Sequence, residues 1–206
     1  MRIITELKQV GKSEKYKLFL NDEYVCDLSL ETIYKNALRE GVEVGNQQLE
    51  EMKFESDKFF ALTAGTNLIS KSVKTKKQLM ESLAKKGFNK EVQAYVADKL
   101  EGYGYINDLQ FAINFVESAK KTNGKLVIKQ KLFQKGVSAE NIEKALEGLQ
   151  QEDEACKLAF KFMKNKEKSQ EAKQKLYRYL LSKGFDYSEI SSAVSKIFKG
   201  DDDDWN

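Results

Sequence analysis

The chain has 206 residues, of which 33% are charged and 41% hydrophobic, and it contains neither proline nor histidine. The absence of histidine excludes Ser-His-Asp triads, histidine general bases and metal sites with histidine ligands. No apolar run is long enough to span a bilayer and the first residues lack the apolar core of a signal peptide, so we expect a cytoplasmic protein without a membrane segment.

The net charge of +3 conceals an uneven distribution along the chain. Residues 1–66 hold 9 Lys and Arg against 12 Asp and Glu, whereas residues 67–200 hold 26 against 16. A basic body of this kind favours a polyanionic or acidic partner, and a solvated lysine-rich surface is the alternative interpretation.

Residues 1–66 differ in pattern from the rest of the chain. The strings IITELKQ, KYKLFL and EYVCDL predict strands, and Asn21–Asp22 is a plausible hairpin turn between two of them. We expect a helix capped by Ser29 that stops at Gly41, followed by a second helix through NQQLEEMKFESDKFFALTAG. This region is therefore predicted to be a small β-hairpin-plus-helix appendage.

A basic string, KSVKTKK, occupies residues 71–77 at the start of the first repeat. Lysines on one helix end contribute additively to binding of phosphates, while a solvated helix start is the alternative. The candidate partner- or DNA-binding residues here are Lys71, Lys74, Lys76 and Lys77.

Three near-copies of one hexapeptide, LAKKGF, LFQKGV and LLSKGF, place Gly87, Gly136 and Gly184 at intervals of 49 and 48 residues. Apolar residues eight and four positions before each glycine form one stripe of a helix. Glycine suits the left-handed position after a helix, and the apolar residue that follows it completes a Schellman cap. An Asn, Ser or Asp two residues later predicts the N-cap of the next helix. The three glycines are therefore predicted to be structural hinges.

The interval leaves room for a third helix in each repeat. NDLQFAINFVESAKK, capped by Asn107, is expected to close the first repeat, and QEDEACKLAFKFMKNK the second. We therefore predict a mainly α protein, with three tandem three-helix repeats (the last truncated) in an elongated curved array. The predicted boundaries are 1–66 for the appendage, 67–122, 123–168 and 169–200 for the repeats, and 201–206 for an acidic tail.

Within the first repeat, GYGYIND at residues 102–108 is predicted to be a turn between two helices. Tyr103 and Tyr105 are candidates for stacking on a ligand, although packing of Tyr103, Tyr105 and Ile106 in the core is the favoured interpretation. An isolated GxG after a helix does not make a phosphate loop.

A second group of lysines brackets the start of the second repeat. A basic stripe and a merely solubilising surface are equally good interpretations, and the scarcity of interleaved aromatics argues against a channel that stacks bases. The candidate partner- or DNA-binding residues here are Lys120, Lys121, Lys125, Lys129, Lys131 and Lys135.

The remaining features point away from enzymatic chemistry. No nucleophile, base and oxyanion site assemble from the pattern, so we expect no enzyme, no catalytic residue, no cofactor and no metal. The final DDDD is interpreted as a solubilising tail, with phosphate mimicry as the less favoured alternative.

Taken in order, these motifs resemble the RecX family of bacterial proteins that regulate the RecA recombinase. The likeness rests on Ser72–Leu79 leading into LAKKGF, on GYIND followed by Phe111–Ala112, on the Gly124 turn, and on the blocks LFQKGVSAENIEKAL and LLSKGFDYSEISSAV. It covers essentially the whole chain, the N-terminal IITELK and its hairpin included.

The resemblance implies a non-enzymatic protein of recombination, DNA repair and the SOS response. Such a protein, expected here as a monomer, binds RecA and its filament on single-stranded DNA, lies in the filament groove, and inhibits strand exchange and ATP hydrolysis, with weak direct DNA binding possible. Two alternatives stay open, namely a helical repeat protein that binds nucleic acid without RecA and a helical scaffold for a different partner.

Overall fold

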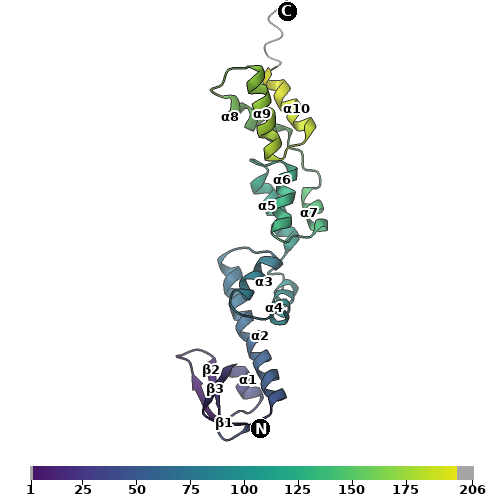
Figure 1. Ribbon diagram of the computed structural model, residues 1–206. Helices are drawn as coiled ribbons and strands as arrows, with labels where there is room; N and C mark the ends of the chain where they lie inside the picture. Colours follow the sequence, from purple (N-terminus) through teal and green to yellow (C-terminus); the bar gives the residue numbers. More distant parts are fainter. Residues whose placement is uncertain (1, 199–206) are drawn as a thin grey trace, which may run out of the picture. The chain divides into compact units, whose positions relative to one another are not determined.

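The computed structural model describes residues 2–198 and confirms the mainly helical class (Figure 1). The chain divides into two compact units, Met1–Ile106 and Asn107–Asn206. The acidic tail predicted at residues 201–206 lies outside the described residues. No helix among residues 2–198 combines the length and the apolarity needed to cross a membrane.

The first unit begins with a four-stranded antiparallel sheet in the order β3-β2-β1-β4. Its strands are β1 Arg2–Gln9, β2 Lys15–Leu20, β3 Glu23–Ser29 and β4 Glu43–Val44. Asn21 and Asp22 both have positive φ, 50° and 68°, as a two-residue hairpin turn of type I′ requires. The predicted hairpin is thus confirmed, and β1 and β4 extend it.

The helix expected after the hairpin is shorter than predicted. The Ser29 side chain caps α1 (Leu30–Lys35) by accepting from the Thr32 amide, as expected, but α1 ends six residues before Gly41. The helix ends here for two reasons. The side-chain amide of Asn36 donates a hydrogen bond to the Thr32 carbonyl at 2.9 Å, and the backbone of Ala37 adopts a positive φ of 49°. The chain then returns to bury Leu38 in the sheet core.

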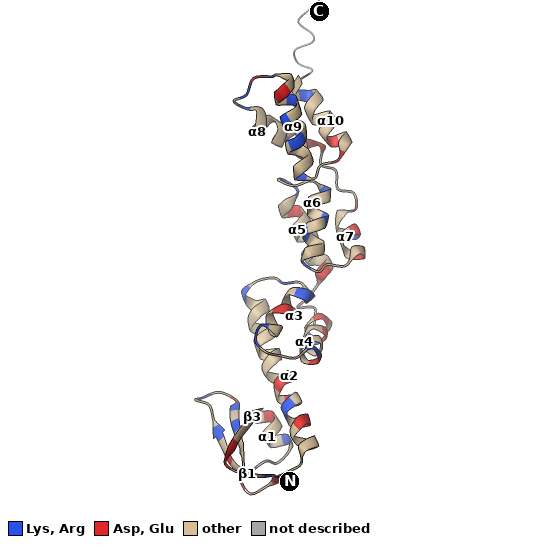
Figure 2. Ribbon diagram, in the orientation of Figure 1, with Lys and Arg blue, Asp and Glu red and all other residues tan. Residues whose placement is uncertain are grey.

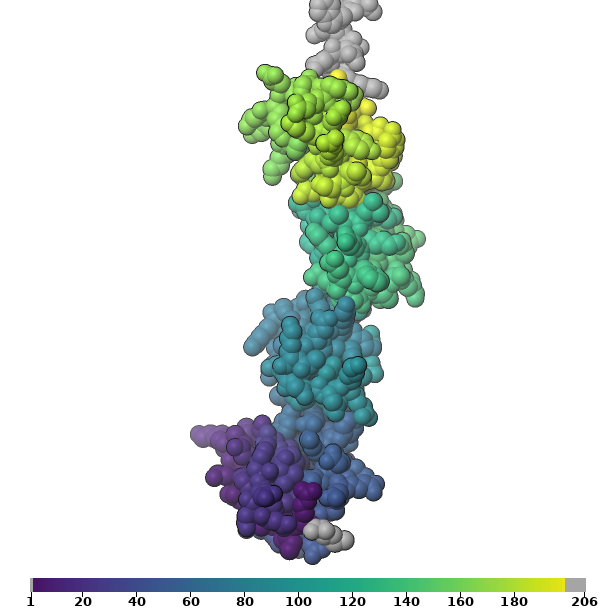
Figure 3. All heavy atoms as spheres, viewed as in Figure 1, coloured from purple at the N-terminus to yellow at the C-terminus, as the bar shows by residue number. Residues whose placement is uncertain are grey.

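A single helix, α2 (Asn46–Lys71), runs through the boundary that was predicted at residue 66. Gly65, the last residue of the string predicted for this helix, lies inside it. A Cβ there would be 2.9 Å from Cγ1 of Val96 and 3.2 Å from Cδ1 of Leu100. Gly65 therefore permits close packing on α4 (Lys90–Gly102). In Figure 3 the purple atoms of the sheet lie against the blue atoms of α2.

Three hydrophobic cores group the helices in threes. The second half of α2 packs with α3 and α4, α5 packs with α6 and α7, and α8 packs with α9 and α10. These helices are α3 Lys76–Ala84, α4 Lys90–Gly102, α5 Asp108–Ala119, α6 Lys125–Gln134, α7 Ala139–Leu146, α8 Glu152–Met163, α9 Gln170–Lys183 and α10 Tyr187–Phe198.

This grouping differs from the predicted boundaries at residues 122 and 168. The helix expected to close the first repeat, α5, shares its core with the two helices that follow it, through Ala112 and Val116 packed with Ile128 and Leu132. In the same way α8 shares its core with α9 and α10, so the third three-helix group is complete and not truncated. A repeat of 48–49 residues has the same length whichever helix is counted first, so the pattern defines the period and not the starting point.

The three hinge glycines have the predicted geometry, with φ of 91° at Gly87, 85° at Gly136 and 87° at Gly184. After each helix, the residue following the glycine donates its amide to the carbonyl five positions earlier, at 3.3, 3.2 and 3.4 Å. These are the bonds of a Schellman cap. The predicted N-caps are also present, Asn89 and Ser138 each accepting an amide and Asp186 forming a capping box with Glu189.

Within the second unit, the start of α6 meets the end of α9. The Gly124 amide donates to the Lys183 carbonyl at 2.8 Å, and the Leu126 amide donates to the Gly184 carbonyl at 3.1 Å. A Cβ on Gly124 would lie 2.2 Å from the carbonyl carbon of Gly184, and one on Gly184 would lie 2.6 Å from the Val127 nitrogen. Only two glycines allow this backbone contact, and Figure 3 shows the two helical groups directly against each other.

A buried glutamine strengthens the same region. The side-chain amide of Gln151, 1% exposed, donates to the carbonyls of Lys120 at 3.1 Å and Asn123 at 2.9 Å. Since Gln151 is the N-cap residue directly before α8, the loop between α5 and α6 is attached to the third helical group.

Three alanine substitutions separate the roles of the glycines. Gly87→Ala meets no atom within 4 Å, so only its left-handed backbone costs stability, by about 1–2 kcal/mol. Gly124→Ala has an ordinary φ but collides with backbone, and overpacking of this kind costs about 1–3 kcal/mol or more. Gly184→Ala carries both penalties and should destabilise most. Denaturant unfolding of the full chain measures the order, and equal losses for Gly87→Ala and Gly184→Ala would contradict it.

Cys26 lies in the sheet core with 5% of its surface exposed, and burial raises the pKa of its thiol from 9.0 to about 11, with nearby Lys53 opposing the shift. The thiolate is the reactive form, so at pH 8 alkylation of native Cys26 should be about a hundredfold slower than that of the unfolded chain. A Cys156→Ser background isolates this thiol, and iodoacetamide labelling read by mass spectrometry gives the rate. A native pH profile with its midpoint near 9 would contradict the prediction.

Candidate functional site

The four lysines predicted at residues 71–77 lie on three different elements of the first unit. Lys71 ends α2, Lys74 lies in the connecting loop, and Lys76 and Lys77 begin α3. The helix starts after Thr75, whose side chain forms a capping box with Gln78. The expectation that these lysines share one helix end is therefore wrong.

Lys76 forms ion pairs with two carboxylates of its own chain. Its ammonium lies 2.8 Å from Asp98 and 2.7 Å from Glu101 on α4, and hydrogen bonds to these two carboxylates raise its pKa. Lys77 lies 4.0 Å from Glu81 on the same helix. The ion pairs of Lys76 with α4 hold the start of α3 in place. They also leave the Lys76 ammonium poorly placed to contact a phosphate.

The six lysines predicted at residues 120–135 are brought together around α6 of the second unit. Two of them pair with carboxylates, Lys120 with Glu117 at 2.7 Å and Lys129 with Glu143. Lys131 donates to the Asn123 side chain at 2.9 Å.

The other three differ in their surroundings. Lys135 lies 6.0 and 5.5 Å from the ring centroids of Phe111 and Phe115, which favours a cation–π contact. Lys121 is exposed in the loop before α6, and Lys125 is exposed at the first position of α6. Part of the predicted basic stripe is thus engaged in contacts within the chain.

The structure also reveals an apolar component of this surface that sequence reasoning missed. Leu126 and Phe133 on α6 are 61% and 70% exposed, on the side away from the buried Ile128 and Leu132. They are seven residues apart, so they share one face of the helix. Their spacing was the available signal. The lysines of α6 are blue in Figure 2, and between Lys125 and Gln134 the sequence has no acidic residue. We call the exposed surface formed by Leu126, Phe133 and the nearby lysines the α6 face.

Tyr103 and Tyr105 are exposed, 63% and 67%, and form an edge-to-face pair with centroids 6.3 Å apart. The prediction that they pack in the core is wrong, while that for Ile106, 2% exposed, is confirmed. Gly104, at φ 75°, ends α4, and the Tyr105 amide bonds the Leu100 carbonyl at 2.9 Å. GYGYIND is thus a fourth Schellman stop, and the turn directs the tyrosines outward.

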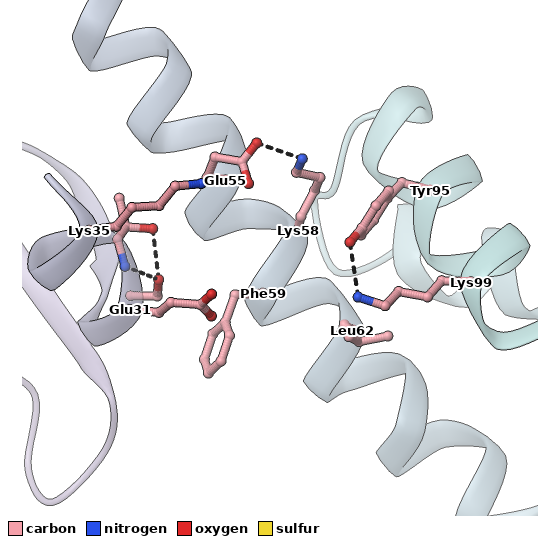
Figure 4. A pocket seen from close by; sticks show the side chains of 10 residues that line it. Glu31, Lys35, Glu55, Lys58, Phe59, Leu62, Tyr95 and Lys99 are labelled. Carbon is pink, nitrogen blue, oxygen red and sulfur yellow. Dashed lines mark hydrogen bonds and ion pairs between the residues drawn. The ribbon is translucent and has the colours of Figure 1, made fainter. Parts of the chain in front are cut away.

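A small pocket of about 120 Å³ lies between α1, α2 and α4 (Figure 4). Three of its charged groups have partners, since Lys58 pairs with Glu55 at 2.6 Å and Lys99 donates to the Tyr95 hydroxyl at 3.1 Å. The Lys58 ammonium also lies 4.8 Å from the Tyr95 ring centroid. We interpret the pocket as a polar seam that joins α2 to α4. In the part of the chain that is described, no group of three Cys, Asp or Glu side chains is arranged to hold a metal ion.

Comparison with protein families identifies the two helical groups of the second unit. The family model described as RecX, second three-helix domain, matches residues 107–146, and that of the RecX third three-helix domain matches residues 150–194. The first match spans the group α5–α7, and the second spans α8, α9 and most of α10.

Full-length relatives show the same similarity. A regulatory protein RecX of Clostridium botulinum (strain Alaska E43) is 32% identical over 204 residues, covering 95% of this chain and 96% of its own. That of Bacillus subtilis (strain 168) is 30% identical and covers 99% and 80%.

Two crystal structures have a similar fold. One, described as regulatory protein RecX, has a TM-score of 0.70 at 22% identity and covers 97% of this chain and 100% of its own. The other, RecX from Lactobacillus salivarius, has a TM-score of 0.63 at 25% identity and covers 68% and 96%.

Proposed function

Because the chain belongs to the RecX family of regulatory proteins, we propose that it binds RecA and its filament on single-stranded DNA and inhibits strand exchange and ATP hydrolysis. In this proposal it acts as a monomer in the cytoplasm, lies in the filament groove and regulates without catalysing a reaction.

The observation that carries the proposal is the α6 face. Exposed large apolar side chains on a helix that also carries lysines fit a protein partner with acidic and apolar patches. A surface evolved for phosphates alone would have no use for Leu126 and Phe133 at 61% and 70% exposure.

The engagement of several lysines supports the same choice. Lys76, Lys120 and Lys129 already contact carboxylates of the chain, so fewer charges remain to displace counterions from a nucleic acid. Lys121 and Lys125 would guide an acidic partner surface onto the α6 face.

Tandem units suit a filament as the partner. A filament presents the same protomer surface repeatedly, and several weak contacts on one chain add through effective concentration. In our proposal three helical groups contribute contacts of this kind. Their occupation of the filament groove blocks access of the second DNA duplex.

The decisive experiment measures RecA's DNA-dependent ATP hydrolysis at substoichiometric and equimolar amounts of this protein, with binding to bare single-stranded DNA recorded alongside. Inhibition while most DNA remains uncovered supports the proposal. Strong binding to bare DNA without inhibition would replace it with the RecA-independent nucleic-acid function.

Removal of the apolar component of the α6 face should weaken inhibition. In Leu126→Ser/Phe133→Ser the half-maximal inhibitory concentration is expected to rise about tenfold or more, because buried aromatic and aliphatic anchors carry most interface energy. Phe160→Ser removes a side chain of similar exposure, 57%, from α8 and is the matched control. Equal effects of the two variants would contradict a role for the α6 face.

Charge reversal tests the basic component separately. Lys121→Glu/Lys125→Glu should lower affinity for the filament several-fold at low salt, and the difference from wild type should shrink as salt screens it. Lys157→Glu/Lys161→Glu makes the same charge change at exposed positions of α8. The prediction fails if both double variants weaken binding to the same extent, and circular dichroism verifies that helicity is retained.

A further inference from the structure

A groove in the first unit follows one face of α2 and belongs to none of the surfaces described above. Its first half, about 520 Å³, lies between α2, β3 and the hinge after α3. Its second half, about 550 Å³, continues along α2 past Thr63, Asn67 and Leu68 to Lys71. Phe60 and Lys86 line both halves, so the two form one continuous groove.

Apolar side chains line much of the groove. Tyr24 is 53% exposed, and Phe60, Leu68 and Phe88 are half-buried. Apolar surface of this kind accommodates apolar side chains from a partner, and it offers little to a ligand made only of phosphates.

The charges divide unevenly between the two halves. In the first half Lys15 is bound to Asp27 at 2.6 Å, and Lys53 faces Asp57, whose pKa is raised chiefly by burial. Among the described residues that line the second half, Lys71 and Lys86 are charged and none is acidic. An acidic group is therefore favoured at the Lys71 end, whereas the two aspartates of the first half already have lysines beside them.

We propose that this α2 groove is the docking site for an acidic segment of the partner protein, which places a carboxylate between Lys71 and Lys86 and an apolar side chain against Phe60. The inference rests on the proposed function for the identity of the partner, but the groove can be tested without it. It also gives Lys86, part of the LAKKGF stop signal, a second role at the surface.

The first test requires no RecA. A fluorescent peptide of alternating Glu and Leu, a poly-Glu peptide and an oligothymidylate are titrated with the full chain, and binding is followed by anisotropy. The Glu-Leu peptide should bind best, and Lys71→Glu/Lys86→Glu should weaken it at least about tenfold. Lys85→Glu/Lys90→Glu changes two exposed lysines outside the groove and should have little effect. Preferential binding of oligothymidylate that depends on Lys71 and Lys86 would overturn the proposal, as would no peptide binding.

The second test maps the occupant in the complex. A photo-crosslinking p-benzoylphenylalanine replaces Asn67, which lines the groove, or its neighbour Thr66, which lines a different depression with Ile69 and Tyr105. On RecA filaments, position 67 should crosslink to a segment rich in Asp and Glu and position 66 should not. Inhibition without any crosslink from position 67 would overturn docking in the α2 groove and leave the proposed function intact. Peptide binding without inhibition would overturn the proposed function and leave docking in the α2 groove intact.

Discussion

The second unit depends on a contact between two helix ends. The first amides of α6 and the last carbonyls of α9 have no partners within their own helices, and here they satisfy each other through the Gly124 and Gly184 backbones. The arrangement also aligns the positive end of one helix dipole with the negative end of another. A side chain at either glycine would push the two helix ends apart. The absence of a Cβ atom at both positions therefore allows the α5–α7 and α8–α10 groups to join. The contact also fixes the start of α6, and thereby the face that exposes Leu126 and Phe133.

The recurring hexapeptide is an architectural element. Each copy encodes the same helix stop, since a left-handed glycine and the apolar residue after it satisfy the last carbonyls. The second position differs between the copies, being Ala84, Phe133 and Leu181, and all three side chains are exposed. One local solution to the problem of ending a helix is thus reused while the surface changes. Three helical groups can then present three different surfaces to a partner that repeats.

Counting lysines overestimates the charge available to a partner. Lys76 and Lys129 are held by carboxylates on neighbouring helices, and Lys135 lies near two aromatic rings. In both units the informative combination is an exposed apolar surface next to lysines, on the α6 face and in the α2 groove. Such a combination matches a protein with acidic and apolar patches better than a bare nucleic acid, whose backbone is uniformly charged. Each unit thus contributes a surface of similar chemistry.

The sequence alone determined the features that depend on contacts within a few residues: the helix stops at Gly87, Gly136 and Gly184, the N-caps, the Asn21–Asp22 turn and the helical period. Tertiary structure decided which helices share a core, that α2 continues past Gly65, and that Tyr103 and Tyr105 face outward. It also decided which of the ten predicted lysines are engaged, since the partners of Lys76 and Lys129 lie on other helices. Caps and turns are short-range interactions that a few adjacent residues specify. Burial and ion pairing depend on where distant segments meet, and a repeating pattern gives every unit the same local code without saying which neighbour it packs against.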